Sequence, residues 1–526
     1  MTSILKYLNR ALLVLLLAAF AACSDNEGGN ESNGNGDDGN TETPADGDTY
    51  GYIKDTNGNP VEGVVVSDGY SCTATDAEGR YALTRNADAG FVFYSLPSAY
   101  KVSVDKTYKL PRFFARLQAG TARYDFTLEA LAAPEKRFDL ICIGDPQINE
   151  ASHAVRFKEE AGREIRVYAA SAGVPCYGIT LGDHVNNKWT LFTNMVVALQ
   201  PEQTGVPVFA TIGNHDHEFP TADEKAARAK YESYFGPVDY SFNRGDVHVV
   251  SMDNVIHSCK ASADYEGGFT AAQYAWLKQD LSFVPKDKMV ILCVHIPFRG
   301  GWGTNSAHAD ADKYYDEVLD LLSQYEYAAI MSAHTHSNIN YIHRKNGKEI
   351  FEHVTGTTCG AWWRSTVCTE GTPIGFGLYR IDGNRMEEWA YRSVRHDEQF
   401  QIRLYRASDT FVGGAKYRFK QTGADQIVAN IWNWDPSWTV NVYENDVLSG
   451  QMTRNSDIDA WTVAYHIGLL NNTDSYRKSS DHMFHYTLKN PAAAVRVEAI
   501  DRFGNKYEQT VFTDPAEHPG DFHADF

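Results

Sequence analysis

The chain of 526 residues is too long for one compact core, so we expect two to four domains. Its hydrophobic content of 43% and charged content of 22% are ordinary for a soluble globular protein. The formal net charge of −20 argues against a dedicated DNA- or RNA-binding protein, whose surface would be basic. A nuclease is disfavoured for the same reason, and only a local positive groove would revive it.

The first 22 residues have the pattern of a signal peptide. Lys6 and Arg10 precede an apolar run over residues 11–22, which is too short to span a bilayer. The run ends in two alanines directly before Cys23, which resembles the cleavage site of a bacterial lipoprotein. Cys23 would then carry a lipid and anchor the mature protein to a membrane outside the cytoplasm. A simple secretory signal is the alternative, because Phe20 is not the commonest residue three positions before the cysteine.

A flexible tether and a small β-domain are expected next. Residues 23–48 are rich in Gly, Asn, Asp and Thr and hold almost no apolar residues, which is typical of a tether. Over residues 49–131, short β-type runs such as Phe91–Tyr94 alternate with turn signals such as Asp76–Gly79. This rhythm predicts a β-sandwich. It resembles the carboxypeptidase-regulatory-like modules of secreted bacterial proteins, which implies a spacer or adaptor role.

Residues 137–395 alternate between apolar strands and amphipathic helical stretches, which predicts an α/β domain. The predicted helices cover residues 154–172, 270–283 and 311–325. The predicted strands are Phe138–Ile143, Tyr177–Leu181, Val206–Ile212, Val247–Met252, Met289–Val294 and Ala328–Ser332. In open α/β sheets the ligand site lies beyond the carboxyl ends of the strands, so polar residues at those ends are candidate site residues.

Residues 400–526 return to short β-type runs and predict a C-terminal β-domain. Its predicted strands are Thr439–Tyr443, Met483–Leu488, Val495–Ile500 and Lys506–Phe512. We expect Trp432, Trp434 and Trp438 to pack inside this domain rather than to form a platform for sugars.

The eight cysteines point to buried thiols rather than to a cysteine-based metal site. Cys142 and Cys293 lie inside apolar strands. Cys359 and Cys368 could pair in an oxidising compartment, although spacing alone does not determine connectivity. No CxxC motif occurs, which excludes zinc-ribbon and thioredoxin-like sites.

Five short polar clusters stand where strands of the central region end. They are Gly144–Gln147, Gly182–Asn186, Gly213–Asp216, Val294-His295 and Ala333–His336. Together they supply carboxylate, amide and imidazole groups, the mixed ligands that divalent transition metals prefer. Each cluster alone has a plainer explanation, such as a turn or a buried core histidine. As an ordered set at strand ends, they predict a metal site.

The order Asp-x-Gln, Gly-Asp-x-x-Asn, Gly-Asn-His-Asp, His and Ala-His-x-His resembles that of the calcineurin-like metallophosphoesterases. The motifs cover the central region, and the flanking β-domains also resemble those of some bacterial members. The resemblance implies an α/β fold, a metallophosphoesterase-type αββα sandwich flanked by two small all-β domains. It also implies a binuclear metal-dependent hydrolase that acts on phosphate mono- or diesters outside the cytoplasm.

The resemblance assigns two metal sites that share Asp183. One site would be formed by Asp145, Gln147, Asp183 and His336, and the other by Asp183, Asn214, His295 and His334. Two ions roughly 3.5–4 Å apart need such a shared carboxylate to offset their repulsion. They would clamp a phosphate oxygen and supply a bridging hydroxide that attacks phosphorus directly, without a covalent enzyme intermediate.

The resemblance also implies an acid and an ion preference. His215 would protonate the leaving oxygen, and Asp216 would orient the imidazole of His215 by accepting a hydrogen bond. Gln147 stands where many members have histidine, and its amide oxygen is a harder, neutral ligand. Among Mn, Fe, Zn and Mg, we therefore favour Mn²⁺.

Substrate contacts are expected from two loops. Arg299 follows the His295 strand and could hold a phosphate bidentately. Trp362 and Trp363, followed by Arg364, could stack on a sugar or a base, or could instead pack in the core. The expected substrate is a phosphorylated small molecule, lipid or glycan, and not a nucleic acid.

Further histidines and a rival function stay open. His184, His217, His257 and His308 could line the cleft or lie at the surface, and we favour the surface for most of them. His184 and His217 are expected near the metals because they lie inside motifs. The rival is a non-catalytic surface lipoprotein that binds glycan through its β-domains and keeps a relic metal site. Gln147 keeps this alternative open, because it stands where many family members have histidine and could weaken the metal site.

Overall fold

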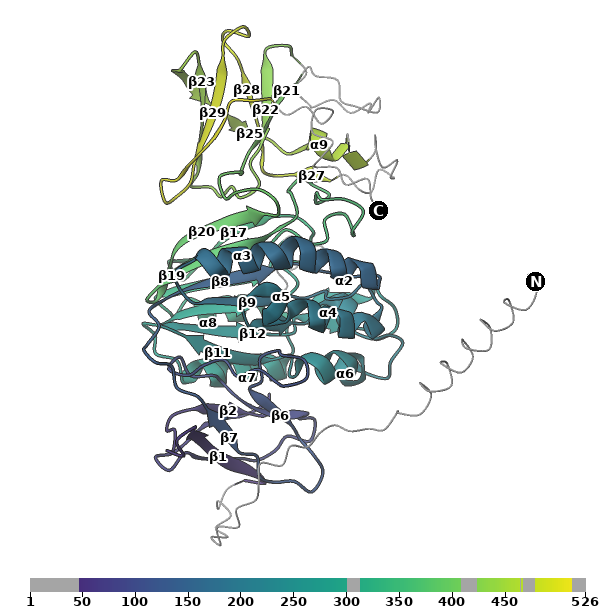
Figure 1. Ribbon diagram of the computed structural model, residues 1–526, viewed down its shortest axis with the longest axis vertical. Coiled ribbons are helices and arrows are strands. Elements are labelled where there is room, and N and C mark those ends of the chain that lie inside the picture. Colours follow the sequence, from purple (N-terminus) through teal and green to yellow (C-terminus); the bar gives the residue numbers. More distant parts are fainter. Residues whose placement is uncertain (1–46, 300–312, 408–422, 464, 467–477, 513–526) are drawn as a thin grey trace, which may run out of the picture. The chain divides into compact units, whose positions relative to one another are not determined.

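The computed structural model describes residues 47–299, 313–407, 423–463, 465–466 and 478–512 (Figure 1). The predicted signal peptide, Cys23 and His308 lie outside these ranges. The described residues belong to one compact unit, Asp46–Phe526. Within the described ranges, no helix has both the length and the apolar character that crossing a membrane requires.

Two sheets form the centre of the fold. The first has the order β10-β9-β8-β19-β20 and the second the order β11-β12-β15-β16-β18-β17. The strands of the first are β8 (Arg137–Ile143), β9 (Cys176–Leu181), β10 (Val208–Thr211), β19 (Gly375–Asp382) and β20 (Arg385–Ser393). Those of the second are β11 (Tyr240–Arg244), β12 (Val247–Ser251), β15 (Met289–Cys293), β16 (Tyr327–Ser332), β17 (Ile339–Lys345) and β18 (Lys348–Val354). The six strands predicted for this region are confirmed, with ends within two residues of those expected.

Alternate residues of β8 show how the layers stack. Leu140 and Cys142 belong to the hydrophobic cluster that also contains the second sheet. Ile141 and Ile143 belong to a different cluster, which contains the first group of helices. Successive side chains of a strand point to opposite faces, so the first sheet lies between those helices and the second sheet. This arrangement confirms the αββα fold.

The helices cover the outer faces of both sheets. Residues of α2 (Ala151–Phe157), the π-helical η1 (Lys158–Gly162), α3 (Arg163–Ser171) and α4 (Phe192–Leu199) pack on the first sheet, with α5 (Pro201–Thr204) beside them (Figure 1). Trp276 and Leu277 of α7 (Ala271–Ser282) and Val318 of α8 (Tyr315–Leu322) pack on the second. The remaining helix of this region is α6 (Glu224–Phe235), with the 3₁₀ turns η2 (Trp189–Leu191) and η3 (Asn214–Asp216).

The N-terminal strands pack directly on the second sheet and on α7. They form the sheets β4-β1-β7 and β3-β2-β5-β6. Their bounds are β1 (Thr49–Asp55), β2 (Val65–Ser67), β3 (Cys72–Ala74), β4 (Arg80–Leu83), β5 (Phe91–Tyr94), β6 (Phe114–Arg116) and β7 (Phe126–Leu128). The Trp276 indole donates a hydrogen bond of 3.0 Å to Ser67, and Leu96 forms a β-bridge with Phe242. These strands therefore share a core with the central sheets.

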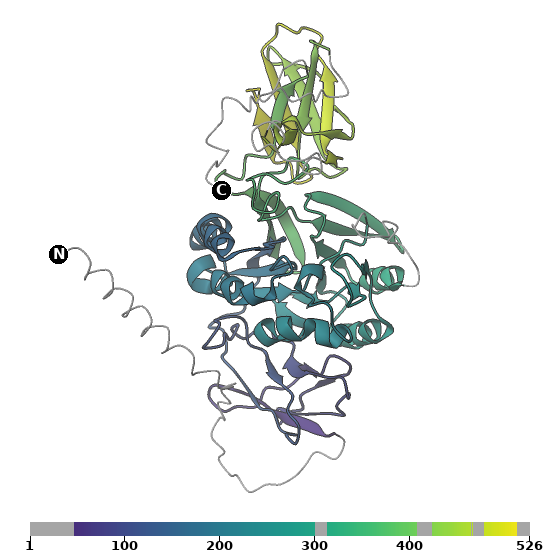
Figure 2. The same cartoon turned by 90° about the vertical axis from the view of Figure 1, so that its right-hand side faces the viewer.

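The C-terminal strands form two four-stranded sheets, β21-β22-β28-β25 and β24-β23-β29-β30, that share one core (Figure 2). Their bounds are β21 (Arg403–Arg406), β22 (Gln426–Asn430), β23 (Thr439–Glu444), β24 (Val447–Gln451), β25 (Thr453–Arg454), β28 (Met483–Thr487), β29 (Val495–Ile500) and β30 (Lys506–Gln509). The short elements β26 (Asp457–Ile458), α9 (Ala460–Thr462) and β27 (Ser479–Ser480) lie beside them. Trp432 and Trp438 are buried and Trp434 packs on Phe484, as predicted.

The cysteines are free thiols wherever the structure describes them. Cys142 and Cys293 are fully buried, as predicted. The pairing considered for Cys359 and Cys368 is not formed, since both are free and buried. The two thiols face different groups: Cys359 lies 3.6 Å from the Gly360 carbonyl and Cys368 lies 3.6 Å from the Thr357 hydroxyl.

Candidate metal centre

The candidate ligands meet at one edge of the two central sheets. Asp145, Asp183 and Asn214 follow β8, β9 and β10, and His295 and His334 follow β15 and β16. These strands run parallel within each sheet, so their carboxyl ends lie at the same edge. The backbone N–H of Gln147 donates to the Asp183 backbone carbonyl at 2.6 Å, which joins the first two motifs directly.

One group of donor atoms surrounds the imidazole of His295. Its Nε2 lies 3.3 Å from Asp183 Oδ1, 2.9 Å from Asn214 Oδ1 and 3.1 Å from His334 Nδ1. Ligand atoms that share a cation at about 2.0–2.2 Å stand at such separations from one another. Of the described residues, Asp183, His295 and His334 bring their ligand atoms within 4.8 Å of one another and form a candidate metal triad.

The orientation of His295 favours a cation at this place. Its Nδ1–H donates to the Leu181 carbonyl at 2.7 Å, so in the neutral ring Nε2 carries a lone pair. That lone pair faces the Asp183 and Asn214 oxygens, which are also acceptors. Only a proton or a metal ion at Nε2 makes the arrangement favourable. Metal-binding histidines are commonly held in this way: one ring nitrogen donates to a carbonyl, and the lone pair of the other nitrogen faces the metal.

The second group of donors contains buried polar atoms without hydrogen-bond partners. They are Asp145 Oδ1, Gln147 Oε1 and His336 Nδ1. Asp145 Oδ1 stands 3.7 Å from His336 Nε2, and the Gln147 amide reaches Asp183 Oδ2 at 3.1 Å. An unmet buried polar atom costs about 1–3 kcal/mol. Three such atoms on candidate ligands fit a site that binds a cation.

Five of the candidate ligands have left-handed backbone angles. The φ angles are 40° at Asp145, 38° at Gln147, 53° at Asp183, 65° at His334 and 55° at His336. A residue other than glycine in this region costs about 1–3 kcal/mol and persists only where its surroundings require it. The angles end each strand abruptly and turn the side chains toward one another, which accounts for the convergence.

The ionisation of the cluster also fits cation binding. Burial, together with the Asp183 charge, raises the pKa of Asp145 well above its ordinary value. Burial is the largest influence on the pKa of His295 and would lower it, but the charge and hydrogen bond of Asp183, the charge of Asp145 and the Leu181 carbonyl together raise it to about 9. Burial lowers the pKa of His336, which keeps its imidazole neutral and able to bind a metal. A divalent cation would relieve the repulsion between the two carboxylates.

His215 lies at the rim of this cluster with its ring partly exposed. Its Nδ1 is 2.8 Å from Asn187 Oδ1, and its Nε2 is 4.0 Å from Asp183 Oδ2. The side chain is 23% exposed, whereas Asp183 is 1% exposed. Sequence reasoning missed Asn187, although it directly follows the Gly-Asp-x-x-Asn motif.

The predicted partnership of Asp216 with His215 is wrong. Asp216 accepts hydrogen bonds from the backbone N–H groups of His184, Val185 and Gly213, at 2.8, 3.2 and 3.0 Å. Its other contact is with His184 Nδ1 at 2.9 Å. Consecutive residues of a 3₁₀ turn point about 120° apart, so Asp216 faces the interior while His215 faces the rim. Asp216 therefore ties the second and third motifs together.

Three family models match consecutive parts of the chain. Residues 125–338 match the calcineurin-like phosphoesterase model, residues 48–131 the model for the N terminal of such proteins, and residues 352–507 the model for their C terminal. The chain belongs to the calcineurin-like phosphoesterase family.

Curated relatives match a smaller part of this phosphoesterase. Purple acid phosphatase 23 of Arabidopsis thaliana is 26% identical over 181 residues, 31% of this chain and 36% of its own length. Purple acid phosphatase 18 of the same plant is 25% identical over 182 residues, 32% of this chain and 38% of its own. The chain thus spans little more than a third of the length of the curated relatives it matches.

Solved structures resemble the phosphoesterase over about half its length. A purple acid phosphatase from yellow lupin (Lupinus luteus) seeds is 14% identical, with a TM-score of 0.35 over 50% of this chain and 53% of its own. A 5'-nucleotidase precursor from Thermus thermophilus is 10% identical, with a TM-score of 0.30 over 49% and 54% of the two chains.

The predicted substrate contacts of this phosphoesterase differ in their placement. Trp363 is 3% exposed and donates its indole N–H to the Pro146 carbonyl at 2.8 Å, so it packs and does not offer a stacking surface. Trp362 is half-buried, with its ring centroid 4.7 Å from that of His336. Arg299 is exposed, and its guanidinium lies 5.6 Å from the centre of the Tyr341 ring.

Two further histidines lie behind the centre. His217 contacts the Gly213 carbonyl at 2.9 Å and Asp253 at 3.2 Å, and therefore braces the loop that carries Asn214 and His215. His257 was expected at the surface, but it is 3% exposed and its ring stacks on that of His217 at 5.6 Å. The short hairpin of β13 (Val255–His257) and β14 (Tyr265–Gly267) buries it.

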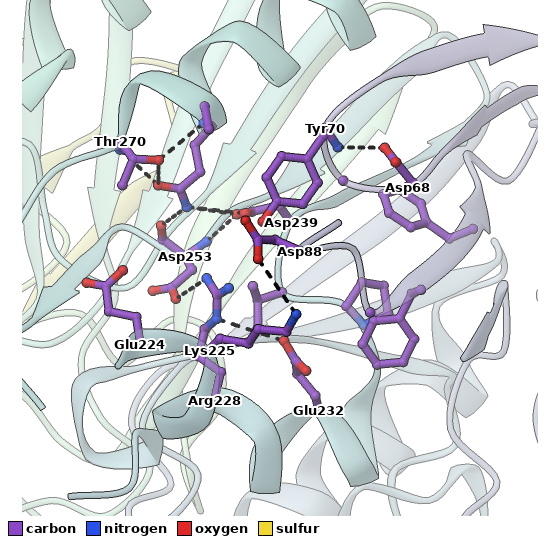
Figure 3. Close-up of a pocket in the computed structure, with 18 of the residues that line it drawn as sticks. Asp68, Tyr70, Asp88, Glu224, Lys225, Arg228, Glu232, Asp239, Asp253 and Thr270 are labelled. Atoms are coloured by element: carbon purple, nitrogen blue, oxygen red, sulfur yellow. Dashed lines mark hydrogen bonds and ion pairs between the residues drawn. The ribbon is translucent and has the colours of Figure 1, made fainter. Parts of the chain in front are cut away.

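A separate cavity of about 210 Å³ lies between the N-terminal strands and α6 (Figure 3). None of the candidate ligands lines it. Carboxylates from both sides face the space, among them Asp68, Glu232 and Asp239, and Arg228 lies 3.5 Å from Asp253. Burial and the charge of Asp253 raise the pKa of Asp239 to about 7.

Asp239, which faces this cavity, is expected to make the stability of the protein depend on pH. Between about pH 4 and 7, folded Asp239 holds a proton that the unfolded chain has released, so the free energy of unfolding falls as the pH rises and levels off above 7. We expect the drop in the free energy of unfolding between about pH 4 and 7 to be about 2–4 kcal/mol smaller in Asp239→Asn than in wild type. Urea unfolding at several pH values from 4 to 8 measures it. Parallel curves for the variant and the wild type would show that Asp239 titrates normally.

Proposed function

We propose that this protein is a binuclear metal-dependent phosphoesterase that hydrolyses phosphate mono- or diesters outside the cytoplasm. The observation that carries the proposal is the convergence of the family's donor set around buried atoms that lack partners. Asp145, Gln147, Asp183 and His336 would hold one ion, and Asp183, Asn214, His295 and His334 the other. The two oxygens of Asp183 face different donors, His295 and Gln147, as a shared ligand requires.

The bound ions would supply Lewis acidity that polarises a phosphoryl oxygen and lowers the pKa of water. The protein would supply the proton for the leaving group. Asn187 Oδ1 accepts from His215 Nδ1–H, so Nε2 is the nitrogen that gains and loses the proton. The exposed edge of His215 lets Nε2–H reach the leaving oxygen of a substrate bound beside Asp183.

Hydrolysis assays with defined metals test the proposal. Purified protein is freed of metal, reloaded with Mn²⁺, Fe²⁺, Zn²⁺ or Mg²⁺, and given 4-nitrophenyl phosphate and bis(4-nitrophenyl) phosphate. We expect turnover and about two bound ions per chain, with Mn²⁺ preferred because Gln147 offers a neutral oxygen. The proposal fails if no ion supports hydrolysis and metal analysis finds none bound.

The extracytoplasmic setting follows from the predicted signal peptide and the lipid expected on Cys23. Recovery of an unprocessed chain from the cytoplasm alone would contradict it. The glycan-binding alternative lacks support in the C-terminal domain, because the buried Trp432 and Trp438 offer no platform to a sugar.

A further inference from the structure

A strained loop places Trp362 beside the candidate metal ligands. Trp362 and Trp363 both have left-handed backbone angles, with φ of 51° and 66°. The Trp363 indole is anchored on the carbonyl of Pro146, which lies between Asp145 and Gln147 in the sequence. The anchor turns Trp362 toward His336, where the two rings lie 4.7 Å apart. Strain of this kind is typical of functional sites.

A lysine from the C-terminal part of the chain reaches the same place. The Lys478 ammonium lies 5.9 Å from the centre of the Trp362 ring. Its backbone N–H donates to the Thr369 carbonyl at 2.8 Å, which holds the segment against the loop. Asn338, two residues after His336, donates to the Trp432 carbonyl at 2.8 Å. The C-terminal part therefore contacts both the loop that carries Trp362 and the segment that follows His336.

Lys478 is a half-buried cationic side chain close to the candidate centre. Burial lowers the pKa of Lys478 to about 7, and the charge of Glu370 opposes this only in part. The Trp362 ring, 5.9 Å from this ammonium, in turn lies 4.7 Å from the His336 ring. The carboxylate of Glu370 accepts hydrogen bonds from the backbone of Asn338 and Thr372, which divides its charge among several donors. An anion bound beside His336 would gain from this ammonium.

We propose that Lys478, aligned by Trp362, binds the phosphoryl group of the substrate and selects phosphate monoesters over diesters. The inference rests on the proposed function and narrows its substrate class. A monoester carries nearly two negative charges at neutral pH, since its second pKa is about 6, whereas a diester carries one. An additional ammonium at the phosphate end favours the more highly charged group.

Lys478→Met, Lys478→Arg and the matched control Lys506→Met test the inference. Lys506 lies in β30, is 60% exposed and pairs with Glu498. With metal-loaded protein, kcat/KM is measured for 4-nitrophenyl phosphate and its bis ester, and the Kd of inorganic phosphate is measured by calorimetry. We expect Lys478→Met to lower monoester kcat/KM and to weaken phosphate binding by about tenfold or more, with less than about threefold change for the diester. Lys478→Arg retains most of the preference, and the control matches wild type.

The outcomes separate the inference from the proposed function. Equal losses on both esters with unchanged phosphate affinity would make Lys478 a structural residue and overturn the inference, as would no change at all. If wild-type protein hydrolyses neither ester, the proposed function fails. The phosphate titration still tests the Lys478 contact in that case. Weaker phosphate binding by Lys478→Met than by wild type supports the anion contact, and an unchanged Kd refutes it.

Discussion

Asp183→Asn is expected to lower kcat by at least about 10³-fold and to remove most of the bound metal. Asp183 is the one candidate ligand that faces both donor groups, through Oδ1 toward His295 and through Oδ2 toward Gln147. Its Oδ1 also accepts the backbone N–H of His215 at 2.9 Å. Asparagine removes the negative charge and one acceptor oxygen, so neither of the two proposed ions would keep its shared ligand.

Metal content per chain, measured beside steady-state rates, distinguishes this loss from unfolding. Asp246→Asn is the matched control, because Asp246 is 46% exposed and pairs with Lys288 at the surface. We expect the control to keep wild-type activity and metal content. An Asp183→Asn protein with two bound ions and normal turnover would show that no bridging carboxylate is needed.

His215→Ala is expected to lower kcat by about 10²–10⁴-fold for an alkyl phosphate while leaving metal content unchanged. An alkoxide is a poor leaving group and needs the proton that Nε2–H would donate. A 4-nitrophenolate leaves without protonation, so the loss on 4-nitrophenyl phosphate is expected to be much smaller. Rates for a series of esters with leaving groups of increasing pKa measure the difference.

Asn187→Leu serves as the companion variant. It removes the acceptor that holds His215 Nδ1 at 2.8 Å but keeps the imidazole. We expect an intermediate loss with the same dependence on the leaving group. Equal losses across the series for His215→Ala would assign His215 to metal or substrate binding instead of proton transfer.

Much of the central fold could be predicted because its strands are local features of the sequence. β15 is a continuous apolar run and β8 is apolar from Leu140 to Ile143, with a histidine or an aspartate just beyond each end. Such runs are typical of buried parallel strands. The candidate ligands could be named for the same reason, since residue type and place at a strand end are visible in the chain.

The remaining strands escaped prediction because their surroundings determine them. β20, with the sequence RMEEWAYRS, carries charged residues along its length and is the edge of its sheet. β19 pairs with β8 through Gly377 and Cys142, more than 200 residues apart in the chain. An edge position and a pairing between distant segments leave no local hydrophobic pattern in the sequence. The placement of β19 and β20 in the first sheet is therefore determined by tertiary pairing.

The sequence by itself determined which side chains of this phosphoesterase are candidate metal ligands and in what order they come. The tertiary structure decided how the neighbouring residues are used. Asp216 contacts His184, and Asn187, not Asp216, contacts the imidazole of His215. Trp363 is buried, whereas Trp362 lies beside His336. These assignments depend on the direction in which each side chain leaves a turn and on contacts between distant segments. Lys478 is the clearest case, since nothing in its local sequence relates it to a histidine 142 positions earlier.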